Sequence, residues 1–200
     1  MTRIGRRILE AGFGHPSGTL GRIGGHLMAR GNADTERHLV DLAGLTEGER
    51  VVVLGPGPGV GLYAAGMRCA NVIGIDPSEL MREAAARRCA ELVRRGRVSL
   101  EAGQAQDTGQ PTASADAVLT VNTVHIWPNL TAGFTEICRV LRPGGRLLLS
   151  AHQKWLPGGA PALAKALAST GFTDIETWTW NPPGRGAGTA VQLRAARSAH

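Results

Sequence analysis

A buried strand that runs into a glycine-rich loop constrains the fold of this chain more than any other feature. Residues Val51–Gly61 read VVVLGPGPGVG, with branched apolar residues first and alternating glycines after them. A continuous apolar run is typical of a central parallel strand covered on both faces. Helical periodicity follows over Val60–Ala70, so this stretch predicts a strand–loop–helix unit of an α/β fold.

The same alternation of strands and helices continues to the end of the chain. Further strands are predicted at residues 71–75, 98–101, 116–121, 146–151, 174–180 and 189–193, and helices at 77–96, 130–141 and 162–170. Helical crossovers imply that the earlier strands pair in parallel. The last two strands are joined by a short loop without a helix, which allows them to be antiparallel neighbours. A turn at Gly144–Gly145 is expected to end the second of these helices.

The first 45 residues differ in character from the rest. Thr35–Leu45 has helical periodicity, with Asn32 or Asp34 as a candidate cap. The glycine-rich residues before it are too few to form a core of their own. We therefore expect residues 1–45 to form a helical cap over the ligand edge of the sheet, and residues 46–200 to form the main domain.

Composition narrows the class of protein. The chain has 200 residues, 42% of them hydrophobic, and a net charge of +6 that comes almost entirely from arginine. A basic surface could attract nucleic acid or an anionic substrate, although solvated helix faces explain it more simply. No apolar run approaches the roughly 20 residues of a membrane span, and the N-terminus lacks the apolar centre of a signal peptide. We expect a soluble, cytoplasmic protein with no membrane partner. No sequence feature indicates an oligomeric state.

The glycine loop argues against phosphate-bearing cofactors. Neither register of the loop satisfies the dinucleotide fingerprint, and Pro56 and Pro58 carry no N–H group for a phosphate. A nicotinamide oxidoreductase is therefore disfavoured, and no triphosphate-binding loop is present. A nucleoside without phosphates fits better. Asp76 ends the second predicted strand, where a carboxylate can accept hydrogen bonds from ribose hydroxyls. Its alternative role is that of a helix-entry residue before Pro77.

Four segments of the chain resemble the class I S-adenosylmethionine-dependent methyltransferases. They occur in the family's order over roughly Leu39–Ser150: VVVLGPGPGVG, VIGIDPSELM, ADAVLTVNTVHIW and EICRVLRPGGRLLLS. The resemblance implies a seven-stranded, mostly parallel Rossmann-like sheet with helices on both faces and an antiparallel last strand. It also implies S-adenosyl-L-methionine as the cofactor, bound by residues 46–200.

The resemblance assigns cofactor-binding roles to particular residues. Those matched to the methionine part, the ribose, the adenine and the segment after the fourth strand are Gly55, Pro56, Gly57, Gly59, Asp76, Pro77, Met81, Gln104, Ala105, Asn122, Thr123 and Val124. Two positions depart from the family's pattern. Val53 stands where an acidic residue is common, and Gln104 replaces an aspartate. These departures motivate the alternative of a cofactor-binding protein of the same fold that does not transfer methyl groups.

Histidines at the ends of the fourth and fifth predicted strands are the candidate catalytic residues. His125 and His152 each follow a strand at the edge where α/β sheets bind ligands, and imidazole is a suitable base near neutral pH. Trp127 and Trp155 could line an apolar acceptor pocket there, or merely pack. His15, His26 and His38 are weaker candidates.

The sequence favours a small-molecule acceptor. The motif NPPG at 181–184 lies in the late hairpin loop and is read as a turn, so a nucleic-acid substrate is the less favoured choice. Three widely spaced cysteines and the absence of a carboxylate cluster predict no metal site. We expect in-line methyl transfer at a site between the N-terminal segment and the fifth and sixth strands.

Overall fold

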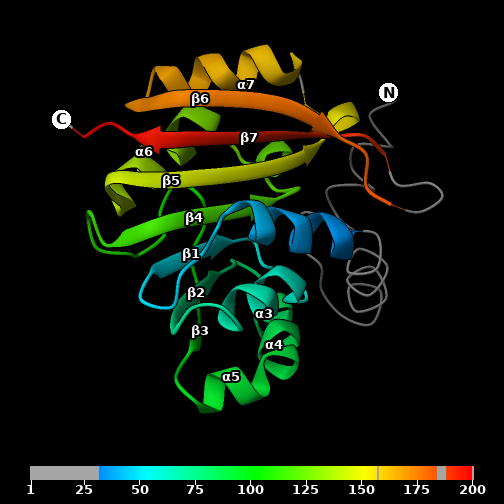
Figure 1. The fold of residues 1–200 in the computed structure, drawn as a ribbon, viewed down its shortest axis with the longest axis vertical. Helices are drawn as coiled ribbons and strands as arrows, with labels where there is room; N and C mark the ends of the chain where they lie inside the picture. Colours follow the sequence, from blue (N-terminus) through cyan, green and yellow to red (C-terminus); the bar gives the residue numbers. More distant parts are fainter. Residues whose placement is uncertain (1–31, 157, 184–187, 200) are drawn as a thin grey trace.

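A seven-stranded sheet forms the centre of the protein (Figure 1). The computed structural model describes residues 32–156, 158–183 and 188–199. The strand order is β3-β2-β1-β4-β5-β7-β6, and β7 runs antiparallel to both of its neighbours. The other neighbouring pairs are parallel, which confirms the predicted fold class. The strands are β1 (Arg50–Leu54), β2 (Asn71–Ile75), β3 (Val98–Glu101), β4 (Ala115–Val121), β5 (Leu141–His152), β6 (Phe172–Trp180) and β7 (Ala190–Arg197).

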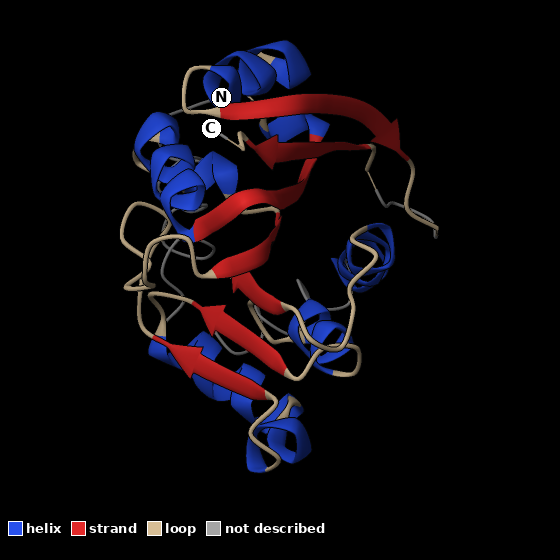
Figure 2. Ribbon diagram, turned by 60° about the vertical axis from the view of Figure 1, so that its left-hand side comes forward, coloured by secondary structure: helices blue, strands red, loops and turns tan. Residues whose placement is uncertain are grey.

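Helices cover both faces of the sheet (Figure 2). One face carries α6 (Leu130–Val140) and α7 (Gly159–Ala168), whose apolar residues share a core with β5. The other carries the helix of residues 32–42, α3 (Val60–Gly66), α4 (Glu79–Arg88) and α5 (Ala90–Arg94). Two short 3₁₀ turns, η2 (Val124–Ile126) and η3 (Gln153–Trp155), follow β4 and β5. None of the helices in the described part of the chain is long and apolar enough to cross a membrane.

The two cores explain why β1 is apolar throughout. Val52 and Leu54 point into the core beneath α6, whereas Val51 and Val53 point toward the helix of residues 32–42. Side chains of a strand alternate between its faces, so a strand buried on both sides needs apolar residues at every position. The predicted central strand is confirmed.

Several element boundaries differ from the sequence-based expectation: β6 begins at Phe172, β7 continues to Arg197, and α7 begins at Gly159. Two further differences are irregularities within an element. The single helix expected over residues 77–96 is interrupted at Cys89, whose φ of −93° and ψ of 14° are not helical. The strand expected at 146–151 begins already at Leu141, which pairs with Ala115, and residues 142–145 form an irregularity within β5. A Cβ at Gly145 would lie 2.8 Å from the carbonyl oxygen of Arg142, so the backbone passes too closely there for a side chain.

The described part of the expected N-terminal cap packs on the sheet. The helix of residues 32–42 buries Leu39 and Val40 in the core that contains Val51, and Arg146 Nε donates to the carbonyl of Ala43 at 2.9 Å. Residues 1–31, with His15 and His26, lie outside the described residues. Apolar burial therefore fixes at least this helix to the main domain.

Candidate cofactor and active site

The glycine loop after β1 is a tightly packed backbone turn. Gly55, Gly57 and Gly59 have φ values of 63°, 50° and 88°, in the left-handed region that favours glycine. A Cβ at Gly59 would lie 2.9 Å from Cα of Ala85 in α4, and one at Gly55 would lie 2.5 Å from Thr123 Cγ2. The loop is thus packed against α4 and the segment after β4, and of the three glycines only Gly57 faces open space, where a cofactor could approach the backbone closely.

Asp76 lies at the carboxyl end of β2 and also shapes the entry into α4. Its Oδ1 accepts a hydrogen bond from the backbone N–H of Ser78 at 2.9 Å, and its carbonyl accepts one from Arg82 Nη1 at 2.8 Å. The residue is 7% exposed. The helix-entry role considered from the sequence is therefore present. A role toward the ribose stays a prediction. Next to it, Pro77 is exposed and Met81 is buried.

The segment after β3 forms the third part of this edge. Gln104 and Asp107 exchange two backbone hydrogen bonds of 2.9 and 3.1 Å, which make a turn. Gln104 is exposed, whereas Ala105 is buried and faces Gly133 of α6. The exposed amide can donate to or accept from a nucleobase.

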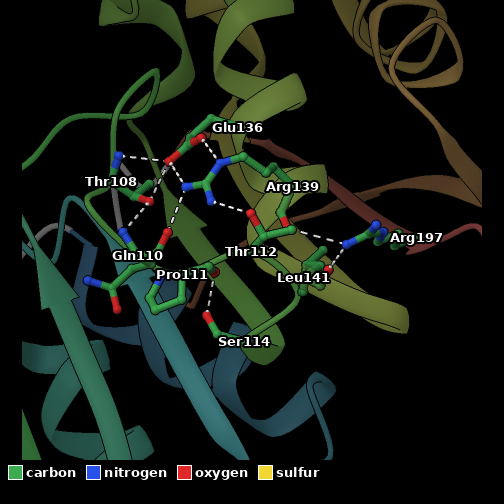
Figure 3. A network of polar contacts seen from close by, with 9 residues as sticks. All are labelled: Thr108, Gln110, Pro111, Thr112, Ser114, Glu136, Arg139, Leu141 and Arg197. Atoms are coloured by element: carbon green, nitrogen blue, oxygen red, sulfur yellow. Dashed lines mark hydrogen bonds and ion pairs between the residues drawn. The ribbon is translucent and has the colours of Figure 1, made fainter.

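A buried carboxylate ties this segment to α6 (Figure 3). Glu136 Oε1 accepts from the backbone N–H of Thr108 at 2.9 Å and from its hydroxyl at 2.6 Å, and Arg139 Nε donates to Oε2 at 2.7 Å. Arg139 Nη2 also donates to the carbonyl of Gln110 at 2.7 Å. The Arg139 guanidinium and the Thr108 donors lower the pKa of Glu136 to about 2. The sequence signal was a glutamate on the buried face of an amphipathic helix.

Asn122 connects the end of β4 to two other elements. Its φ of 54° is unusual for a residue with a side chain, although asparagine tolerates this region. The side-chain Nδ2 donates to Asn32 Oδ1 at 2.9 Å, and Oδ1 accepts from the backbone N–H of His152 at 2.9 Å. Thr123 and Val124 follow and are buried, with the hydroxyl of Thr123 against that of Thr120. Asn122 therefore joins the first described helix to the end of β5.

His125 and His152 both contact the ring of Trp155. The ring of Trp155 lies 4.8 Å from that of His125 and 4.6 Å from that of His152, centroid to centroid. Both Nδ1 atoms are buried, and that of His125 has no hydrogen-bond partner among the described residues, whereas the backbone of Gly188 lies against His152 and opposes the lowering of its pKa. Burial lowers the pKa of both imidazoles; the nearby His152 adds to the effect on His125, and Lys154 adds to that on His152. Two neutral imidazoles therefore lie together, and each can accept a proton.

The other ring side chains considered in the sequence, Trp127 and His38, lie in environments that differ from that of Trp155. Trp127 packs edge-on against Phe134 of α6 at 5.5 Å and belongs to the core on that face, as the packing alternative expected. His38 stacks on Trp180 at 4.1 Å with an interplanar angle of 8°, which brings the helix of residues 32–42 to the end of β6. Trp155, but not Trp127, accompanies the histidines.

Sequence reasoning missed Glu36, a carboxylate beside the glycine loop. Its Oε2 accepts from the backbone N–H of Gly61 at 2.6 Å. Burial raises the pKa of Glu36 to about 7, although the Gly61 hydrogen bond and the positive charges of Arg88 and Arg37 oppose that change. The two residues are 25 positions apart, and no local pattern connects them. Among the described residues, no three His, Cys, Asp or Glu side chains gather as metal ligands.

Comparisons with known proteins agree with this geometry. A family model described as a methyltransferase domain matches residues 53–149. An uncharacterized methyltransferase of Bacillus subtilis, YdaC, is 33% identical over 130 residues, which cover 64% of this chain and 70% of that protein. The nocamycin O-methyltransferase of Saccharothrix syringae is 34% identical over 117 residues, 57% of this chain and 41% of its own length. The chain thus spans less than half of that second relative.

A solved structure shows the same fold at lower sequence identity. A phosphoethanolamine N-methyltransferase of Haemonchus contortus, in complex with phosphomonomethylethanolamine and S-adenosylhomocysteine, has a TM-score of 0.70. It is 18% identical, and the match covers 83% of this chain and 53% of that one.

Proposed function

This chain belongs to the class I S-adenosylmethionine-dependent methyltransferases, and on that basis we propose that it methylates a small-molecule acceptor beside Trp155. The observation that carries this proposal is the group His125–Trp155–His152, with two neutral imidazoles against one indole. Asn122 is hydrogen-bonded to the backbone of His152 and follows the strand that lies beside β1 and its glycine loop. Acceptor and cofactor would then meet at one edge of the sheet.

The chemistry divides between cofactor and protein. S-adenosylmethionine supplies a methyl group that is already activated on sulfur. The glycine loop and Asp76 would hold and orient the cofactor, and an indole wall would hold a planar or apolar acceptor. Well-oriented reactants gain on the order of 7–11 kcal/mol from positioning alone. His125 or His152 would accept the hydroxyl or amine proton of the acceptor as the methyl group is transferred.

The acceptor site would lie between the helix of residues 32–42 and the ends of β5 and β6. Two contacts support this placement: Asn32 bonds to Asn122, and His38 stacks on Trp180. The compounds named with the Saccharothrix syringae protein and with the Haemonchus contortus structure, nocamycin and phosphomonomethylethanolamine, are small molecules. These names support the class of acceptor and not its identity.

Product formation tests the proposal. Incubation with S-adenosylmethionine and a panel of hydroxylated and amino small molecules should yield S-adenosylhomocysteine with at least one of them. His125→Ala and His152→Ala should lower kcat with that acceptor more than they weaken cofactor binding measured by calorimetry. Production of S-adenosylhomocysteine only with nucleic acid or protein acceptors would refute the small-molecule assignment. Normal kcat in both variants would show that neither histidine is a base.

A further inference from the structure

A small, partly open space lies between the helix of residues 32–42, the glycine loop and the end of β4. Its accessible volume is about 20 Å³, which is room for a single water-sized group. Leu39, Val40, Val53 and Leu119 make most of its side-chain lining apolar, and Gly55 contributes backbone. Glu36 is the one ionisable side chain among the residues that line it. An isolated carboxylate in such a place calls for a positive partner.

The positive groups already near Glu36 do not bond to it. Arg37, on the same helix, donates to Asp34 at 3.2 Å, and Arg88, on α4, donates to the carbonyl of Pro58 at 2.8 Å. Both act on Glu36 only through their charge, and burial outweighs them in setting its pKa. The one hydrogen bond recorded for the carboxylate among the described residues comes from Gly61, a neutral backbone donor. Within the described part of the chain, the carboxylate therefore has no cationic hydrogen-bond partner.

Glu36 also supplies a carboxylate at a place where β1 has the apolar side chain of Val53. Val53 is two residues before Gly55 and lines the same space, but its side chain can neither accept a hydrogen bond nor carry charge. Glu36 brings a carboxylate to this place from another element. Gly55 and Pro56, which also line this space, belong to the loop that the family resemblance sets against the methionine part of the cofactor. That part carries an α-ammonium group beside its carboxylate, and the ammonium group is a cation of about the size of a water molecule.

We propose that Glu36 binds the ammonium group of the S-adenosylmethionine amino acid part and so replaces, from the first described helix, a charged group that β1 does not supply at Val53. This inference rests on the cofactor assignment of the site and adds a residue to it. Charge-assisted hydrogen bonds are the stronger ones, so the pair would contribute both affinity and orientation of the methyl donor. The helix of residues 32–42 is then a part of the cofactor site and not only a cover.

The test compares the affinities of two ligands for one variant of the protein. Glu36→Gln keeps an oxygen acceptor for Gly61 but removes the charge. Calorimetry at pH 8 with S-adenosylhomocysteine, which has the ammonium group, should show at least a tenfold weaker Kd for Glu36→Gln than for the wild type. Binding of 5′-methylthioadenosine, which lacks the amino acid part, should be unchanged. The control Asp34→Asn removes the same charge from an exposed position of the same helix and should bind both ligands normally.

The other possible results of this experiment each either contradict or support the role proposed for Glu36. Equal affinity of Glu36→Gln and wild type for S-adenosylhomocysteine would overturn the proposal, and so would an equal loss for both ligands, because that indicates a structural role. Restoring a carboxylate on β1, in Glu36→Gln/Val53→Asp, should recover S-adenosylhomocysteine binding if this variant shows a native circular dichroism spectrum. If the wild type itself binds neither ligand, the cofactor assignment fails, which is distinct from failure of the Glu36 inference.

Discussion

Replacing the buried Glu136 by glutamine should destabilise the protein in a way that depends on pH. The pKa of Glu136 falls from 4.5 to about 2, first because of Arg139 and then because of Thr108. At about 1.4 kcal/mol for each tenfold change in an equilibrium constant, this displacement corresponds to about 3 kcal/mol in favour of the ionised form. Arg139 is 38% exposed, so solvent screens part of the attraction. We expect Glu136→Gln to lower the free energy of unfolding by about 2 kcal/mol at pH 7.

The sign of the pH dependence follows from the direction of the pKa change. A carboxylate whose pKa is lower in the folded state contributes its full stabilisation above the unfolded value of 4.5, and loses it as the pH falls toward 2. The difference between wild type and Glu136→Gln should therefore shrink progressively below pH 4.5. Urea denaturation followed by circular dichroism at pH 7, 5 and 3.5 measures this difference directly.

An exposed ion pair provides the matched control. Glu83 and Arg87 lie 3.4 Å apart on α4, and both side chains are more than half exposed. Glu83→Gln should change the free energy of unfolding by less than about 0.5 kcal/mol. An equal cost for the two variants, or a Glu136→Gln cost that stays constant from pH 7 to pH 3.5, would refute the assignment of stability to this buried carboxylate.

Two further predictions follow from the loop and the histidines. Gly59→Ala should lower the free energy of unfolding by more than about 1 kcal/mol, because a left-handed φ of 88° is unfavourable for alanine and its Cβ would lie 2.9 Å from the Ala85 backbone. Gly57→Ala, with open space at its Cβ, should cost less in the same urea denaturation. With a hydroxylated acceptor, kcat should fall on acidification with a midpoint below pH 6.5, since the pKa of His125 and of His152 is lowered. A midpoint above 6.5 in the pH–rate profile would exclude these imidazoles as the base.

The sheet could be predicted from short stretches of sequence, because the apolar pattern of a strand and the type of connection to the next strand are both visible locally. Val51–Leu54 is apolar at every position because both of its faces are covered. The sequence predicts no helix between the last two strands, and this correctly indicated that they pair in antiparallel fashion. The start of β5 at Leu141 was not predicted, because the proline and glycines of residues 142–145 are typical of a turn and here form an irregularity inside a strand. The break at Cys89 was missed because apolar periodicity continues across it.

The polar contacts of the site were less predictable, because they join residues far apart in the chain. Glu36 bonds to a backbone group 25 positions away and Glu136 to one 28 positions away. No periodicity encodes such a pair; only the folded sheet brings its members together. The two histidines were predicted individually, since each follows a strand at the same edge. Their common contact with Trp155 depends on the 3₁₀ turn after β5 and could not be read from spacing.

Asn32 and Glu36 are four residues apart on the same helix, and side chains at this spacing project from one face, a turn above one another. Asn32 holds Asn122 next to the histidines, whereas Glu36 holds Gly61 next to the glycine loop. The two contacts cannot be altered independently by a movement of the helix. Any axial rotation or slide of this helix would therefore displace its contact beside the histidines and its contact beside the glycine loop together.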